Sequence, residues 1–306
     1  MLNEVGFANP ETVTAVKLVD SGGPALLVST LHGMGTTLFL RPLAGAEDSP
    51  RELMPLATPD RPAWDAQPLP DGAVLAAYTV PGSSLCSIAM VASGHPERAN
   101  VTGHYPFGVF GPPRFVKGEA GHRPSIVTIA IDDEGESKAV LFAPRQDGGY
   151  GEYRVLDTGT AVPQQPMMLQ APSGYVLLYK QYTPGSGAPE RVDAIDSTIT
   201  PGPLFCRRLD ANLRSTEPAS QILPGPVYQF DAVLDAGRLL VLATTQKGYL
   251  LAIGGFDGKQ TGLAVSERAW PEPLFSPSLL MGHAGLHLAA LQAAGTSRAK
   301  ILVGKH

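Results

Sequence analysis

The stretch "DAGRLLVLATTQKGYLLAIGGFDGK" (residues 235–259) consists of two short apolar runs, each closed by a glycine turn. Short apolar runs bounded by glycine turns are typical of paired β-strands. The turn that opens this stretch, "LDAG", has counterparts along the whole chain. Their glycines are Gly22, Gly72, Gly121, Gly174, Gly237 and Gly285, with steps of 50, 49, 53, 63 and 48 residues between them. The stretch is therefore one copy of a repeat that fills the chain.

Each repeat has room for four strands, and convincing helical periodicity is absent. A period of about 50 residues with four strands predicts the blade of a β-propeller, so we expect an all-β, six-bladed propeller. The sixth repeat ends after its third strand, and "LNEVGF" (residues 2–7) precedes the first repeat. Pairing these two segments would complete the last blade and remove an unpaired edge. A pair of β-sandwiches and a parallel β-helix are the alternatives, but regular turns disfavour the first and the long steps disfavour the second.

The composition places further limits on the class of protein. The 306 residues are 43% hydrophobic and 17% charged, with 34 Gly, 29 Pro and a net charge of −5. We expect one domain over residues 1–306, and neither nucleic acid nor a membrane as a partner, because no basic stripe or long apolar span occurs. Two cysteines and the lack of a signal-like N-terminus favour the cytoplasm, although a trimmed secreted form stays open.

The chain resembles the β-propeller superfamily in general, over its whole length. In the fourth repeat, "PSGYVLLYKQY" and "PLFCRRLDANLRS" look like the repeat of bacterial propellers in which an apolar strand pair ends in an Arg-Leu-Asp-Ala turn. The Asp box of sialidases, the Gly-Gly doublets of kelch blades and the Trp-Asp repeat signature are all missing. The resemblance therefore implies an architecture and no particular activity.

Polar side chains recur on the strand before each glycine turn, which in a propeller is the strand nearest the axis. Positions nine and seven residues before the glycine share one side of that strand. These positions hold Asp65, Arg114, Gln165, Tyr228, Ser276 and Ser278. If that side faces the axial channel, it forms a polar mouth that binds a ligand through Arg114, Gln165 and Tyr228. The alternative is that Asp65 and Arg114 only tie two blades together. The opposite side holds Trp64, Phe115, Met168 and Asp231, which suit packing between blades.

The loops after the next strand in each repeat lie on the same face as this mouth. They add His32, Tyr78, Lys180 and Tyr182, of which we assign Lys180 and Tyr182 to ligand binding. The longest of these loops, residues 183–203, is either a lid or a disordered insertion. A second long connection, residues 103–115, carries aromatic residues suited to stacking on an apolar or sugar-like ligand or to filling the space between blades.

Signals for metals and cofactors are weak. The segment "DDEGE" (residues 132–136) lacks the alternating ligand spacing of a calcium loop. His283 and His287 have a turn between them rather than a helix. An axial calcium ion held by Glu11, Asp65 and Asp231 is disfavoured by their unequal register. We expect no metal and no cofactor, because no phosphate-binding glycine motif opens a helix.

Two functional hypotheses remain. The first is a propeller that binds a small molecule or a glycan at its axial mouth and that works, if it is an enzyme, by acid/base chemistry of the hydrolase, lyase or isomerase type. Asp65, His32 or Tyr78 would then move the proton while Arg114 holds an anion. The second is a non-catalytic scaffold that presents its rim to a protein partner. The polar mouth residues favour the first hypothesis.

Overall fold

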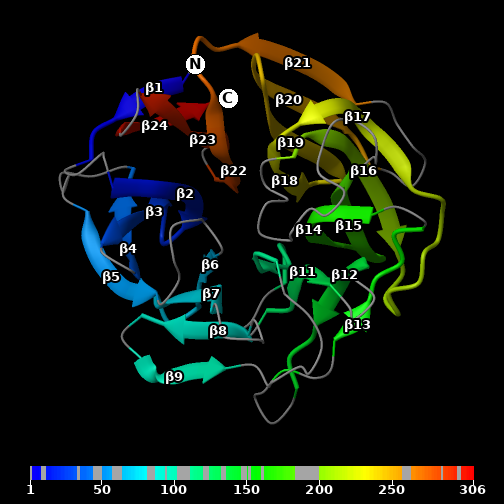
Figure 1. Ribbon diagram of the computed structural model, residues 1–306, viewed down its shortest axis with the longest axis horizontal. Helices are drawn as coiled ribbons and strands as arrows, with labels where there is room; N and C mark the ends of the chain where they lie inside the picture. Colours follow the sequence, from blue (N-terminus) through cyan, green and yellow to red (C-terminus); the bar gives the residue numbers. More distant parts are fainter. Residues whose placement is uncertain are drawn as a thin grey trace. The chain divides into compact units, whose positions relative to one another are not determined.

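In the computed structural model the chain forms an all-β, six-bladed propeller, as the repeat predicted. Six separate four-stranded antiparallel sheets are the blades, and each is built from consecutive strands except the last (Figure 1). Among the described residues no helix is long and apolar enough to cross a membrane. The structure describes residues 2–7, 12–32, 35–43, 50–56, 64–80, 87–93, 95–101, 111–119, 124–131, 136–145, 150, 153–159, 162–182, 200–256, 263–283, 285–294 and 298–306.

The chain divides into two compact units, each with three blades. Unit 1 holds blades 1, 5 and 6. Its strands are β2 (Val13–Asp20), β3 (Pro24–His32), β4 (Gly35–Pro42) and β5 (Arg51–Leu56) in blade 1, β18 (Gln229–Asp235), β19 (Arg238–Thr245), β20 (Gly248–Gly255) and β21 (Ala264–Ala269) in blade 5, and β22 (Leu274–Gly282), β23 (Gly285–Ala294), β24 (Arg298–Lys305) and β1 (Leu2–Val5) in blade 6.

Unit 2 holds blades 2, 3 and 4, and here the strands of every sheet follow chain order. Its strands are β6 (Trp64–Pro68), β7 (Val74–Val80), β8 (Ser87–Ala92) and β9 (His95–Val101) in blade 2, β10 (Arg114–Phe115), β11 (Ile126–Ile131), β12 (Ser137–Phe142) and β13 (Arg154–Val155) in blade 3, and β14 (Val162–Ala171), β15 (Gly174–Tyr182), β16 (Gly202–Leu209) and β17 (Ser220–Val227) in blade 4.

The N-terminal strand completes blade 6, as predicted. β1 runs antiparallel to β24, with Leu2 opposite Gly304 and Val5 opposite Ile301 (Figure 1). Residues from the start and the end of the chain therefore share one sheet, and β1 covers the edge that β24 would otherwise expose.

The hydrophobic core lies where blades of one unit pack against each other. In unit 1, one cluster joins Val16 and Val28 of blade 1 to Leu291 and Ile301 of blade 6. In unit 2, another cluster joins blade 3 to blade 4. In blade 5 the second strand is the most buried: in β19 all residues between its two ends are buried, whereas all six residues of β21 are exposed. This gradient explains the sequence pattern, because the run "LLVLAT" has no polar face and "AVSERA" has little apolar surface to bury.

The glycine turns have the backbone geometry that glycine permits. The turn glycines at 22, 72, 174, 237 and 285 all have positive φ, from 75° to 137°. An L-residue rarely adopts such angles, so the repeat in the sequence is also a repeat of backbone conformation. The sixth turn glycine, Gly121, lies outside the described residues.

Candidate functional site

The polar side chains of the innermost strands in unit 1 bind the backbone of the next blade. Ser276 Oγ lies 3.0 Å from both the amide nitrogen and the carbonyl oxygen of Val16, and Ser278 Oγ accepts the amide N–H of Leu18 at 2.9 Å. Asp231 Oδ2 accepts the amide N–H of Leu279 at 2.7 Å. These side chains link blade 5 to blade 6 and blade 6 to blade 1. In this unit the predicted polar positions contribute to structure.

Asp65 has the same role in unit 2 that Asp231 has in unit 1. Its Oδ2 atom accepts the amide N–H of Phe115 in blade 3 at 2.8 Å, and its Oδ1 atom accepts the amide N–H of Ala66 at 2.9 Å. The number of residues between each aspartate and its turn glycine predicts that Asp65 and Asp231 lie on opposite sides of their strands, whereas in the structure they have the same role. The count fails because Pro68 and Val74, which bound the turn in blade 2, are farther apart than Asp235 and Arg238 in blade 5.

Removing the Asp65 carboxylate should therefore destabilise the protein. An Asp65→Ala variant leaves two buried amide N–H groups without their acceptor, so we expect the free energy of unfolding to fall by roughly 2–3 kcal/mol. The matched control is Asp71→Ala, because Asp71 accepts the amide N–H of Ala73 at an exposed turn, and such surface changes usually stay within about 0.5 kcal/mol. Chemical denaturation of both variants measures the difference. Equal stabilities would contradict the role of Asp65 as a link between blades.

The innermost strands of blades 4 and 6 share a bulge at the same distance from the turn glycine. The pairing of β14 with β15 shifts register between Gln164 and Met167, and that of β22 with β23 shifts between Phe275 and Ser278. Inside each bulge one residue has a positive φ, which is 49° at Gln165 and 51° at Ser276. Left-handed backbone at a residue other than glycine is strained, and such strain often accompanies function.

The two bulges differ in how their side chains are used. In blade 6 the backbone of Val16 contacts Ser276 Oγ, and Gln229 Oε1 accepts the Ser276 amide N–H at 2.6 Å. In blade 4 the amide oxygens and nitrogens of Gln164 and Gln165 are buried, and none of them has a hydrogen-bond partner among the described residues. Gln164 is 3% exposed and Gln165 is 7% exposed. Buried amides usually have hydrogen-bond partners, so these two are candidate ligand-binding groups.

Two cations lie next to these amides. Lys180 is opposite Gln164 in the pairing of β14 with β15, and it is fully buried. Its Nζ atom donates a hydrogen bond to the carbonyl oxygen of Thr200 at 2.7 Å. Burial, with a smaller contribution from the nearby Arg114 guanidinium, lowers the pKa of Lys180 from its ordinary value of 10.5 to about 7. A second cation beside a buried lysine favours a bound anion, which would offset the repulsion.

Backbone contacts between blades 3 and 4 bring Arg114 to this place. Lys117 pairs in parallel with Leu169, and its amide N–H donates to the carbonyl oxygen of Met168 at 3.0 Å. β10, which holds Arg114, also contacts β14, and the Arg114 guanidinium lies close enough to Lys180 to lower its pKa. Arg114 is half-buried. Of the predicted ligand-binding residues, Gln165 and Lys180 thus lie on paired strands of blade 4, and Arg114 lies near Lys180. We refer to these three residues and Gln164 as the amide–cation site.

The remaining predicted site residues are His32, Tyr78, Tyr182 and Tyr228. Tyr78 is half-buried on β7, and Tyr228 is half-buried in unit 1, directly before β18. The side chains of His32 and Tyr182, which end β3 and β15, lie outside the described residues. Their assigned roles, and the catalytic role of Asp65, stay predictions.

Several other predictions fall on residues that the structure does not describe. They concern most of the long connection at 103–115 and of the loop at 183–203, the acidic segment at 132–135, and Glu11. In the described part of the chain no group of three His, Cys, Asp or Glu residues could hold a metal ion. Cys206 is buried, which raises the pKa of its thiol to about 12, so it is a packing residue rather than a nucleophile.

Sequence reasoning missed Gln164, although its signal was present. "VPQQPMMLQA" places two consecutive amides in a strand whose next three residues beyond Pro166 are apolar. Alternation assigns one of them to each side of a regular strand, and only the bulge, which the sequence does not show, changes that assignment.

The fold and this site define a propeller with a buried group of amides and cations in one unit. No protein-family model matches the chain, and no curated protein matches its sequence. Among solved structures, it is similar to a protein of unknown function from Dyadobacter fermentans, with a TM-score of 0.63, 9% identity, and coverage of 100% of this chain and 99% of that chain.

Two enzymes with known structures are also similar. A gluconolactonase from Xanthomonas campestris has a TM-score of 0.56 and 10% identity, with 96% of this chain and 86% of that chain covered. A sialidase from Trypanosoma rangeli, in complex with a difluorinated nononic acid, has a TM-score of 0.60 and 8% identity, with 95% of this chain and 53% of that chain covered. At such identities the likeness shows the propeller fold alone.

Proposed function

We propose that the protein binds a small polyhydroxy carboxylate, such as a sugar acid, at the amide–cation site. The observation that carries the proposal is that Gln164 and Gln165 bury both of their amides without a described partner beside two cations. A side-chain amide both donates and accepts hydrogen bonds, and so does a hydroxyl group, so the two suit each other. A guanidinium suits a carboxylate, because it binds both oxygens at once.

The similar solved structures support this class of ligand. The similar structures include a gluconolactonase and a sialidase that holds a nononic acid derivative. Proteins of this architecture therefore accommodate sugar-derived ligands, and the cations of this chain favour an acidic one. If the protein is an enzyme, Lys180 is the described group of the site whose pKa, about 7, suits proton transfer at neutral pH.

The scaffold hypothesis has less support. A surface that docks a protein partner is expected to present a contiguous apolar patch. In the described part of the chain the large apolar side chains that are exposed are Val155, Val162 and Val265, which lie on three separate strands.

Calorimetric titration with D-gluconate, D-glucuronate and N-acetylneuraminate tests the proposal, with glucose as the uncharged comparison. We expect at least one acid to bind and glucose to bind at least about tenfold more weakly, because glucose lacks the carboxylate that Arg114 holds. Arg114→Met should weaken binding at least about tenfold, and Gln165→Leu about fivefold.

Ser276→Ala is the matched control, because Ser276 occupies the same bulge position in blade 6 and its hydroxyl already binds Val16. Its affinity for the ligand should equal that of the wild type, after thermal melting has shown that each variant is folded. If none of the three acids binds, or if Arg114→Met and Gln165→Leu bind as tightly as Ser276→Ala, the proposal is wrong.

A further inference from the structure

A cavity that is open to solvent lies in unit 1, between the outer parts of blades 5 and 6, and β21, which forms part of its wall, is exposed. Its volume is about 300 Å³, which is at the lower end of the range for small-molecule sites. Blade 5 contributes residues of β20 and β21, and blade 6 contributes residues of β1, β23 and β24. The lining consists of Leu2, Tyr249, Leu251, Ser266, Arg268, Leu288, Gly304, Lys305 and His306.

The cavity exists because a side chain is missing where the two blades face each other. Gly304 pairs with both Leu2 and Leu288 in its sheet, so these three residues share one face of blade 6. Gly304 is buried, yet it places no side chain in the space between them. On blade 5 the opposing surface includes Ser266, whose small side chain lies next to Leu251.

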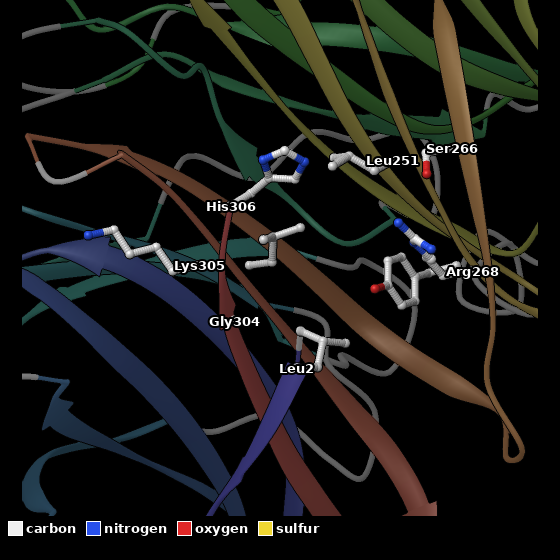
Figure 2. A pocket seen from close by; sticks show the side chains of 9 residues that line it. Leu2, Leu251, Ser266, Arg268, Gly304, Lys305 and His306 are labelled. Carbon is white, nitrogen blue, oxygen red and sulfur yellow. The ribbon is translucent and has the colours of Figure 1, made fainter.

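The cation that faces the cavity is Arg268 of blade 5. Tyr249 pairs with Arg268, and Leu251 pairs with Ser266, so these four side chains share one face of blade 5. Figure 2 shows Arg268, Ser266, Leu251 and His306 around the same space, whereas the side chain of Lys305 extends away from it. The described lining contains no Asp or Glu. No described residue forms an ion pair or side-chain hydrogen bond with the Arg268 guanidinium.

Three leucines give the cavity an apolar surface as well. Leu2, Leu251 and Leu288 come from three strands and two blades. A smaller cavity of about 10 Å³ shares Leu2, Tyr249 and Leu288 with the first and is otherwise lined by residues such as Leu242 and Leu274. The apolar surface therefore continues inward, toward the core between blades 5 and 6. A ligand that fills this space needs an apolar body.

We infer that this cavity binds a small aromatic carboxylate. The carboxylate would pair with Arg268, where a guanidinium can donate two parallel hydrogen bonds. The ring would lie against Leu2, Leu288 and the ring of Tyr249, whose face and edge suit aromatic packing. This site does not depend on the proposed function, because all of its residues belong to unit 1 and the amide–cation site belongs to unit 2.

Titration of the whole protein with 3-phenylpropanoate, followed by ligand-observed NMR, tests the inference. We expect a Kd of about 1 mM or tighter, and about threefold to fivefold weaker binding of the uncharged 3-phenylpropanamide, because Arg268 is exposed to solvent. Arg268→Gln should weaken binding of the acid about threefold to fivefold and leave binding of the amide unchanged. Gly304→Val should fill the cavity and abolish binding of both compounds.

The control is Arg238→Gln, because Arg238 is an exposed arginine paired with Asp235 and does not line the cavity. It should bind 3-phenylpropanoate as the wild type does. If Gly304→Val does not fold, Ser266→Leu fills the cavity from the other blade at an exposed strand. The inference is wrong if 3-phenylpropanoate does not bind, if Arg268→Gln binds it as tightly as Arg238→Gln does, or if the folded filling variant still binds it.

Discussion

Replacing Lys180 by methionine is expected to change how the stability of the protein depends on pH. Between about pH 7 and about pH 9.5, the unfolding free energy of the wild-type protein should rise by roughly 3 kcal/mol relative to that of the Lys180→Met variant. Lys180 is fully buried, and its pKa in the folded protein is about 7 against an ordinary value of 10.5. Between these two values the unfolded chain binds a proton at Lys180 that the folded protein does not. Wild-type stability relative to the variant therefore rises with pH across this window.

Below about pH 7 the lysine is charged in both states and its full burial penalty is present, so the methionine variant should be the more stable protein there. Urea denaturation at a series of pH values measures the effect. Lys300→Met is the control, because Lys300 is exposed and forms a surface ion pair with Glu4; its stability curve should run parallel to that of the wild type. Parallel curves for Lys180→Met as well would show that Lys180 remains charged in the folded protein.

Replacing Gly174 by alanine is expected to lower the free energy of unfolding by roughly 3–5 kcal/mol. Gly174 joins β14 to β15 with a φ of 137°. A Cβ atom there would lie 2.2 Å from the carbonyl oxygen of Leu209 and within 2.9 Å of the Asp210 backbone. Neither contact can be relieved by a side-chain movement, because both involve the backbone of the adjacent turn.

Gly237→Ala separates this overlap from the strain of a positive φ alone. Gly237 occupies the same turn position in blade 5 with a φ of 75°, and a Cβ atom there would have nothing within 4 Å. We expect it to cost only about 1–2 kcal/mol. Thermal melting of the two variants compares them directly. Similar losses would mean that the approach of Leu209 to Gly174 is looser than described.

The strands and turns could be predicted because they depend on local chemistry. Whether a segment such as "RLLVLATT" extends, and whether a glycine follows it, is decided within a few residues. The pairing of the N-terminal segment with the last blade could also be predicted, because a sheet with an unpaired edge needs a partner and only one segment was left without a blade. In this repeat architecture, the local pattern and the need to cover edges together determine the blades.

The candidate site was predictable only in part. The sequence placed Arg114, Gln165 and Lys180 at one end of their strands, and in unit 2 Lys180 lies opposite Gln164 and near Arg114. It could not distinguish Gln165 from Ser276, which have the same position, the same bulge and nearly the same φ. Their difference lies in what the neighbouring blade presents: the backbone of Val16 forms a hydrogen bond with the hydroxyl of Ser276, whereas no described residue forms one with the amide of Gln165.

The sequence by itself therefore determined the all-β class, the blade repeat and which residues stand on each strand, because strand propensity, turn geometry and side-chain alternation act over short distances. Only the tertiary structure decided which polar groups are satisfied, why the pKa of Lys180 falls, and where Gly304 leaves space opposite Ser266. Each of these depends on atoms from different strands, and for the cavity from different blades. Burial, hydrogen bonding and free volume are properties of the packed chain, and they arise only when segments distant in sequence come into contact.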